Sequence, residues 1–163
     1  MKLWIIYKEG IGFSKFIAEM LQDRLEDYID VSVGNAKKIE PAFLVEEEVD
    51  FLIIGDIIHD KIPSVEIKNW LFKYGEISKN KNFNVRAFSG YYVVLTNISV
   101  EPFWSDFLQE NVKAETIYPP ILHLKLNLSE LSLENRAIEL VKDYSNDFIE
   151  FIINNKKRRF KKK

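Results

Sequence analysis

The sequence predicts a single α/β domain with a doubly wound, five-stranded parallel sheet between two helical layers. Short runs rich in Ile, Val, Phe, Tyr or Leu alternate with segments of helical apolar spacing along all 163 residues. Two of these runs, 3–7 and 50–55, are apolar without alternation, which is typical of parallel strands covered on both faces. A hydrophobic content of 47% is ample for such a core.

The elements are expected in regular β-α order. Strands are predicted at 3–7, 29–33, 50–55, 91–97 and 116–124. The first helix is predicted from an apolar face made by Phe13, Phe16, Ile17, Met20, Leu21, Leu25 and Tyr28. The last helix is predicted from a similar face made by Ala137, Leu140, Val141, Tyr144, Phe148, Phe151 and Ile152. Ser64 and Ser132 are the expected N-caps of the third and fifth helices.

Loops at the carboxyl ends of the strands are the expected ligand-binding region of such a sheet. Four loops qualify, at 8–14, 56–63, 97–101 and 125–130. In the first, Gly10 and Gly12 permit a tight turn just before the unpaired N–H groups of a helix N-terminus, so we expect it to bind a phosphate. The same pair of glycines is also compatible with a simple strand-to-helix turn.

Two further features of this loop bear on its ligand. Ser14 is either a phosphate ligand or the N-cap of the first helix, since both roles use an oxygen at the same helix end. The third glycine of a dinucleotide-binding fingerprint would fall at Lys15, and its absence argues against NAD.

Composition and charge exclude several classes of protein. The chain has no cysteine and only 2 histidines, which excludes disulfides and thiolate chemistry and makes a zinc site improbable. No apolar run reaches transmembrane length, and we expect a cytoplasmic protein. Residues 156–163, KKRRFKKK, hold seven of the 23 basic residues, which leaves a body of net charge -9. We therefore divide the chain into a domain, 1–155, and a basic tail, 156–163, which is a candidate contact for an acidic partner, lipid or nucleic acid.

The arrangement resembles the flavodoxin family over nearly the whole length. The resemblance is carried by the strand-loop-helix at 3–14 and by Val49-Asp50-Phe51-Leu52-Ile53-Ile54-Gly55-Asp56 with the loop after it. It implies a sheet of strand order 2-1-3-4-5, a bound FMN, and electron transfer between redox partner proteins rather than conversion of a substrate. Gly12 takes the position of the family's phosphate-loop glycine, and Ser14 that of its last hydroxyl. The residues that the resemblance places at the cofactor are Gly10, Ile11, Gly12, Phe13 and Ser14 at the phosphate, and Ile57, Ile58, His59, Asn97, Ile98 and Ser99 around the ring.

The phosphate loop departs from the family pattern. Glu9 and Ile11 occupy the positions of its first two hydroxyls, and Ile57 and His59 replace its usual proline and aromatic residue. A carboxylate about 4 Å from a phosphate charge costs about 4 kcal/mol at an effective dielectric constant of about 20. That exceeds the roughly 0.5 to 1.5 kcal/mol that a hydroxyl hydrogen bond returns. Lys8 or Lys15 is the available counter-charge.

Two alternatives therefore stay open. The first is a flavin-free module of the same fold that binds a partner at this edge or through the tail. The second is a receiver-like signalling domain, in which Asp56, Thr96 and Lys125 resemble the phosphoacceptor, the switch hydroxyl and the lysine. The first loop offers only Glu9 where a receiver needs paired carboxylates for magnesium.

Phe103 and Trp104 have two interpretations each, whereas His123 has one. Phe103 and Trp104 either form a second wall of a flavin slot or belong to the core. His123 lies in a predicted strand and is expected to be structural.

Overall fold

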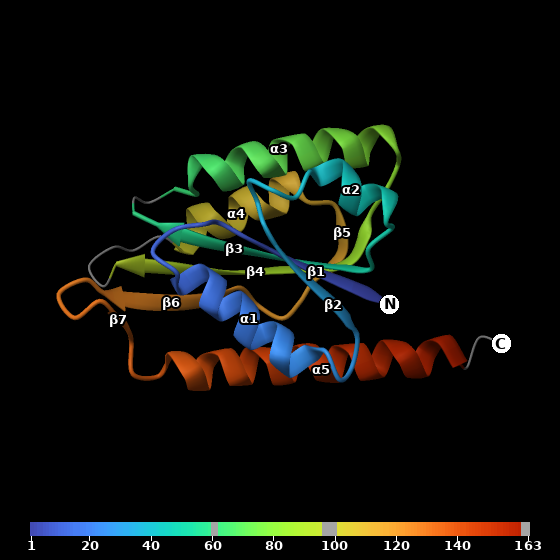
Figure 1. Ribbon diagram of the computed structural model, residues 1–163. Helices are drawn as coiled ribbons and strands as arrows, with labels where there is room; N and C mark the ends of the chain where they lie inside the picture. Colours follow the sequence, from blue (N-terminus) through green and yellow to red (C-terminus); the bar gives the residue numbers. More distant parts are fainter. Residues whose placement is uncertain (60–61, 96–100, 161–163) are drawn as a thin grey trace.

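The computed structural model describes residues 1–59, 62–95 and 101–160 of the chain (Figure 1). Its strands are β1 (Lys2–Tyr7), β2 (Asp30–Asn35), β3 (Phe51–Ile58), β4 (Val85–Leu95), β5 (Ala114–Ile117), β6 (Leu122–Asn127) and β7 (Ser132–Leu133). Its helices are α1 (Phe13–Leu25), α2 (Pro41–Glu46), α3 (Val65–Asn80), α4 (Glu101–Asn111) and α5 (Ala137–Phe160).

The predicted three-layer α/β architecture is confirmed. Helices α2, α3 and α4 cover one face of the sheet, and α1 and α5 cover the other (Figure 1). The strands are in the order β2-β1-β3-β4-β6-β7, with β5 paired to β4 as well, and all pairs are parallel except β6 with β7. This order partly matches the expected 2-1-3-4-5, because β5 and β6 share the place of the fifth strand and β7 is additional.

The predicted strand at 116–124 is divided by two prolines. β5 pairs with the first part of β4 and β6 with its second part, and Pro119 and Pro120 lie between them. Proline has no N–H to give to a sheet, so a continuous strand is interrupted there. The hydroxyl of Ser89 in β4 donates instead to the Pro119 carbonyl oxygen at 2.6 Å, which keeps the crossing attached to the sheet.

Strand β4 begins six residues before the predicted start at Tyr91. Its first half contains Ser89 and Gly90, which weaken the apolar pattern on which the prediction relied. Ser89 is nevertheless fully buried, because the Tyr144 hydroxyl donates to it at 2.7 Å and it donates onward to Pro119. A buried polar residue with both partners satisfied is compatible with a core strand.

The structure confirms one predicted helix cap and corrects two. Ser64 precedes α3, and its hydroxyl accepts a hydrogen bond from the Ile67 N–H at 3.4 Å. The prediction for Ser132 was wrong, because this residue pairs in β7 and α5 begins only at Ala137. Ser14 is not an N-cap either, because α1 begins at Phe13 and Gly12 occupies the cap position.

In both the first and the last helix, the central residues of the predicted apolar face are buried, as expected. Ile17, Leu21 and Leu25 of α1 are buried, whereas Phe16 and Tyr28 are exposed. Phe16 lies beside the buried stripe, and Tyr28 comes after the end of α1. The backbone of residues 156–160, the first part of the basic tail, continues α5 as helix.

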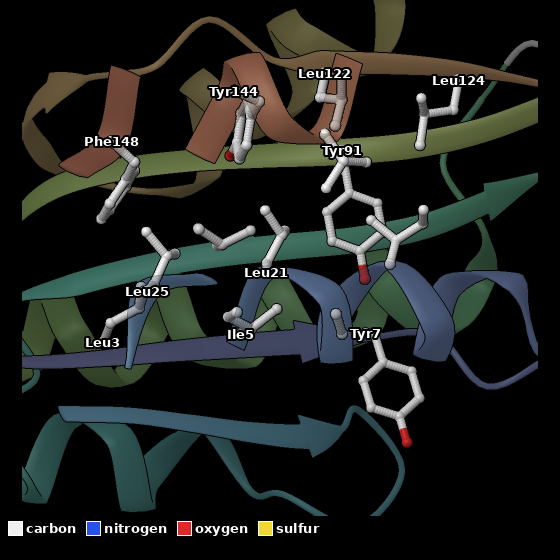
Figure 2. Close-up of a cluster of buried hydrophobic side chains, with 14 of the residues drawn as sticks. Leu3, Ile5, Tyr7, Leu21, Leu25, Tyr91, Leu122, Leu124, Tyr144 and Phe148 are labelled. Carbon is white, nitrogen blue, oxygen red and sulfur yellow. The ribbon is translucent and has the colours of Figure 1, made fainter. Parts of the chain in front are cut away.

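The core consists of two apolar clusters, one on each face of the sheet. All eight residues of β3 are buried, and β3 contributes side chains to both clusters. Figure 2 shows the cluster between the sheet and the helices α1 and α5. In it the ring of Tyr91 points from β4 toward α1, and its hydroxyl donates to the Ser14 carbonyl oxygen at 2.7 Å. On the opposite face His123 stacks on Tyr92 with ring centroids 4.7 Å apart, as expected for a structural histidine.

Gly55 leaves the space that the Tyr91 ring occupies. A Cβ at position 55 would lie 2.1 Å from Tyr91 Cζ and 2.2 Å from its hydroxyl oxygen. We expect Gly55→Ala to lower the free energy of unfolding by about 1–3 kcal/mol, because overpacking forces the ring or the backbone to move. Urea denaturation measures this. The same substitution in a Tyr91→Leu background should cost less, and an equal cost in both backgrounds would exclude the clash as the cause.

Candidate functional site

The loops after β1 and β3 lie next to each other at the carboxyl edge of the sheet. The two strands are parallel neighbours, with Tyr7 in register with Gly55. Immediately beyond, the Lys8 N–H donates to the Gly55 carbonyl oxygen at 2.9 Å. The β1–α1 loop and the chain that follows β3 therefore leave the sheet at the same edge, and a ligand there meets both.

The β1–α1 loop has the backbone conformation that the phosphate prediction requires. Gly12 has φ 93°, a left-handed conformation that favours glycine, and a Cβ there would meet nothing within 4 Å. Within the described residues, no side chain caps the first turn of α1, which follows Gly12 directly. The unpaired N–H groups and the positive end of the helix dipole thus face an exposed loop, a geometry that suits an anion.

Ser14 lies beneath this loop and not on its surface. Ser14 is only 1% exposed, and its hydroxyl oxygen is 3.4 Å from the Tyr91 hydroxyl oxygen. Phe13 beside it is half-buried, and Gly10, Ile11 and Gly12 are exposed. Of the predicted phosphate contacts, the structure therefore brings the backbone of 10–12 to the surface, whereas the Ser14 hydroxyl packs inward.

The predicted ring contacts after β3 are divided in the same way. Ile57 and Ile58 end β3 and are 2% and 1% exposed, whereas His59 is exposed. A Cβ at Gly10 would lie 2.9 Å from Ile57 Cδ1, so the Ile57 side chain packs closely against the phosphate loop. The other predicted contacts, Asn97, Ile98 and Ser99, lie outside the described residues, as does Thr96 of the receiver alternative.

A cleft of about 430 Å³ opens between the β1–α1 loop and the start of α3. Apolar side chains and three ionisable ones line it: Lys8, Ile57, His59, Ile62, Pro63, Ser64, Val65 and Glu66. The cleft contains His59 and Ile57 from the predicted set. The cleft is also lined by residues at the N-terminus of α3, which the resemblance to the flavodoxin family did not place at the ligand.

Glu66 is the functional candidate that the sequence analysis missed. One carboxylate oxygen accepts the Glu9 N–H at 3.4 Å, and the other lies 3.6 Å from Lys37 Nζ. Its side chain is 16% exposed, so this carboxylate is partly shielded from water. A usable signal was present, because the Ser64 cap places Glu66 in the first turn of α3 at the ligand-binding edge.

The two candidate counter-charges of the loop already have partners. Lys8 Nζ donates to the Ile57 carbonyl oxygen at 3.2 Å, next to the cleft. Lys15 Nζ lies 3.5 Å from Glu19, one helical turn further along α1. Lys8 remains close to the loop and offers a positive charge there, whereas Lys15 is directed away along the helix.

Asp56 is fully buried at the end of β3 and fastens the segment that follows. Its carboxylate accepts hydrogen bonds from Ile57 N at 2.8 Å, Ser64 N at 2.9 Å and Trp104 Nε1 at 3.2 Å. Burial raises the pKa of this carboxyl, and the hydrogen bonds from Ser64 and Trp104 and the charge of Lys8 oppose the rise. With both oxygens engaged, Asp56 lacks the accessibility of a phosphoacceptor, which argues against the receiver alternative.

Trp104 and Phe103 have different environments. Trp104 is fully buried and its indole N–H donates to Asp56, so it belongs to the core, the second of its two predicted roles. Phe103 is 60% exposed in the first turn of α4, at the same edge as the loops. Among the described residues, no group of acidic or histidine side chains could hold a metal ion, and no helix is long and apolar enough to cross a bilayer.

Replacing Asp56 by Asn tests this arrangement through its pH dependence. An acid with a raised pKa binds its proton more tightly in the folded chain. Its contribution to the free energy of unfolding therefore falls as the pH rises from the unfolded value, near 3.8, to the raised folded value. The Asn side chain places an NH₂ donor against either the Ile57 N–H or the N–H groups of Ser64 and Trp104, which costs about 1–3 kcal/mol.

We expect wild type to be more stable than Asp56→Asn, by a margin that shrinks as pH rises through this window and is constant above it. Urea denaturation of both proteins at matched pH values measures the margin, and other carboxylates cancel in the difference. A margin that grows with pH would mean that the folded state lowers this pKa.

Solved structures with this arrangement of strands and helices are consistently flavodoxins. Flavodoxin 2 of Bacillus cereus is 15% identical, with a TM-score of 0.70 over 92% of this chain and 99% of its own. A flavodoxin from the domain Archaea is 13% identical, with a TM-score of 0.68 over 93% of this chain and 99% of its own.

The rubredoxin oxygen:oxidoreductase of Desulfovibrio gigas is 11% identical, with a TM-score of 0.67 over 94% of this chain. This chain spans about a third of that enzyme, 36% of its length. No protein-family model and no curated protein matches the sequence. At these identities the likeness establishes the architecture, and the chain has the flavodoxin-like fold that its sequence resemblance predicted.

Proposed function

We propose that the protein binds FMN at the carboxyl edge of its sheet and carries electrons between redox partners. The observation that carries the proposal is the left-handed Gly12 at the N-terminus of α1, in a fold whose neighbours are flavodoxins. A flavin supplies the redox chemistry when bound, and the residues of this chain would bind and orient it.

In this proposal the phosphate is held by main-chain groups. The N–H groups of Glu9, Gly10, Ile11 and Gly12 and of the first turn of α1 are the donors, since backbone donors do not depend on the side chains that this loop lacks. Lys8, the residue directly after β1, would supply a positive charge beside the phosphate. A phosphate contact to the Ser14 hydroxyl would require that hydroxyl to leave its buried position beside Tyr91.

The ring would lie against the segments after β3 and β4. His59 is the exposed residue among the predicted contacts here, and Ile57, which lines the cleft, would supply an apolar base. Ile58 packs into the apolar cluster on the opposite face of the sheet from Ile57. The predicted contacts Asn97, Ile98 and Ser99 complete the ring site in the proposal.

The surroundings of the site are compatible with docking of a redox protein. Several large apolar side chains among the described residues at this edge are exposed, including Ile11, Ile62, Val65 and Phe103. The described part of the basic tail, residues 156–160, lies at the other end of the molecule, because α5 runs toward the amino ends of the strands (Figure 1). A contact of the tail with an acidic partner, a lipid or a nucleic acid would therefore leave the flavin edge accessible.

A flavin-free partner-binding module is the second candidate. It is favoured by the packing of Ile57 against Gly10 and by the Glu66 carboxylate at the Glu9 N–H, since both use space or donors that a flavin would need. Such a module would use the same edge and its exposed apolar side chains for binding a protein.

Titration with FMN and riboflavin separates the two candidates. We expect FMN to bind more tightly than riboflavin, because only FMN offers a phosphate to the loop. Quenching of flavin fluorescence gives both dissociation constants. If neither flavin binds, the flavin-free module is supported and the FMN proposal fails.

The double substitution Glu9→Ser with Ile11→Thr should strengthen FMN binding by about tenfold or more, because it removes a negative charge and adds hydroxyl donors. Riboflavin affinity should change little. Glu115→Ser, at an exposed position of β5, is the matched control for loss of a carboxylate. Unchanged FMN affinity in the double variant would contradict a phosphate site in this loop.

A further inference from the structure

Glu66 places a carboxylate of the protein itself on the candidate phosphate loop. Its Oε1 accepts the Glu9 N–H at 3.4 Å, across 57 residues of sequence. The same side chain is 3.6 Å from Lys37 Nζ, in the segment after β2. Glu66 thereby connects the segments that follow β1, β2 and β3, and it lines the cleft of about 430 Å³ between the first and the third of them.

A phosphate on this loop would compete with Glu66 for the same donor. A backbone N–H makes one good hydrogen bond, so a phosphate oxygen at Glu9 N has to replace Oε1. Two negative groups at neighbouring donors also repel each other, most strongly where water is partly excluded. Glu66 is 16% exposed, so this repulsion is only partly screened.

The nearby cations compensate the repulsion only in part. Lys37 is paired with Glu66, and the Lys8 ammonium donates to the Ile57 carbonyl oxygen. Glu9 adds a second carboxylate to the loop, although its side chain is exposed and well solvated. The partly buried charge of Glu66 therefore opposes a phosphate more than the Glu9 side chain does.

We propose that Glu66 is an internal competitor of the ligand's phosphate and sets the discrimination between phosphorylated and unphosphorylated flavin. This inference rests on the proposed flavin site. Lys37 moderates the competition, because it neutralises Glu66 and holds it when the phosphate takes the Glu9 N–H.

The first test measures FMN and riboflavin dissociation constants for wild type and Glu66→Gln. The variant keeps an oxygen that can accept the Glu9 N–H but loses the charge. FMN should bind about tenfold more tightly, while riboflavin affinity changes less than about twofold. Glu76→Gln, at an exposed position further along α3, is the control for charge loss on the same helix and should change neither constant.

Lys37→Gln should have the opposite sign. Loss of this cation leaves Glu66 uncompensated, so FMN binding should weaken by about threefold and riboflavin binding should not change. If wild type binds FMN and Glu66→Gln leaves its affinity unchanged or lower, the inference is overturned while the flavin site stands. An equal gain for both flavins would also overturn it, because the effect would not involve the phosphate.

A second test needs no flavin. Inorganic phosphate is titrated into ¹⁵N-labelled protein, and the chemical shift of the Glu9 amide gives the affinity of the loop for the anion alone. Half-saturation should occur at about tenfold lower phosphate in Glu66→Gln than in wild type. Equal half-saturation would overturn the inference even if no flavin binds. Absence of flavin binding with a lower half-saturation would overturn the proposed function and the discrimination between flavins, while competition between Glu66 and phosphate would stand.

Discussion

The buried carboxylate of Asp56 organises the edge of the sheet on which the candidate site depends. It lies near the end of β3, a strand with no exposed residue, and its two oxygens accept from the N–H groups of Ile57, Ser64 and Trp104. A buried carboxylate costs free energy unless donors satisfy it, so the surrounding segments are held where these donors can reach it. The start of α3 and the position of α4 beside β3 follow from this constraint.

The position of α3 in turn determines what the phosphate loop can do. Because Ser64 is fixed to Asp56 and caps α3, Glu66 in the first turn reaches the Glu9 N–H. The helix that completes the edge therefore brings a negative charge to a loop whose backbone is suited to anions. The balance between these two features, rather than the glycine pattern by itself, decides how strongly a phosphate binds.

The sequence predicted the features that depend on local pattern. Strands β1 and β3 were found from continuous apolar runs, and the Ser64 cap from its position before a helical segment. It failed where a residue's role depends on distant partners. Ser89 is polar in isolation but is satisfied by Tyr144 and Pro119, so the first half of β4 was missed.

The same limit applies to the site. The loop and its glycines were identified from the sequence, and Gly12 has the expected left-handed backbone. The inward direction of Ser14 depends on Tyr91, which is 77 residues away. The Ser64 cap could place Glu66 at this edge, but its contact with the Glu9 N–H depends on the pairing of β1 with β3, which no local motif reveals.

The proposed function depends on a flavin phosphate bound to the backbone between β1 and α1. Amide chemical shifts of ¹⁵N-labelled protein, recorded with and without FMN, test this binding. We expect the largest changes at residues 9–13, with smaller ones at His59. Changes centred on any other part of the molecule, or none at saturating FMN, would contradict it.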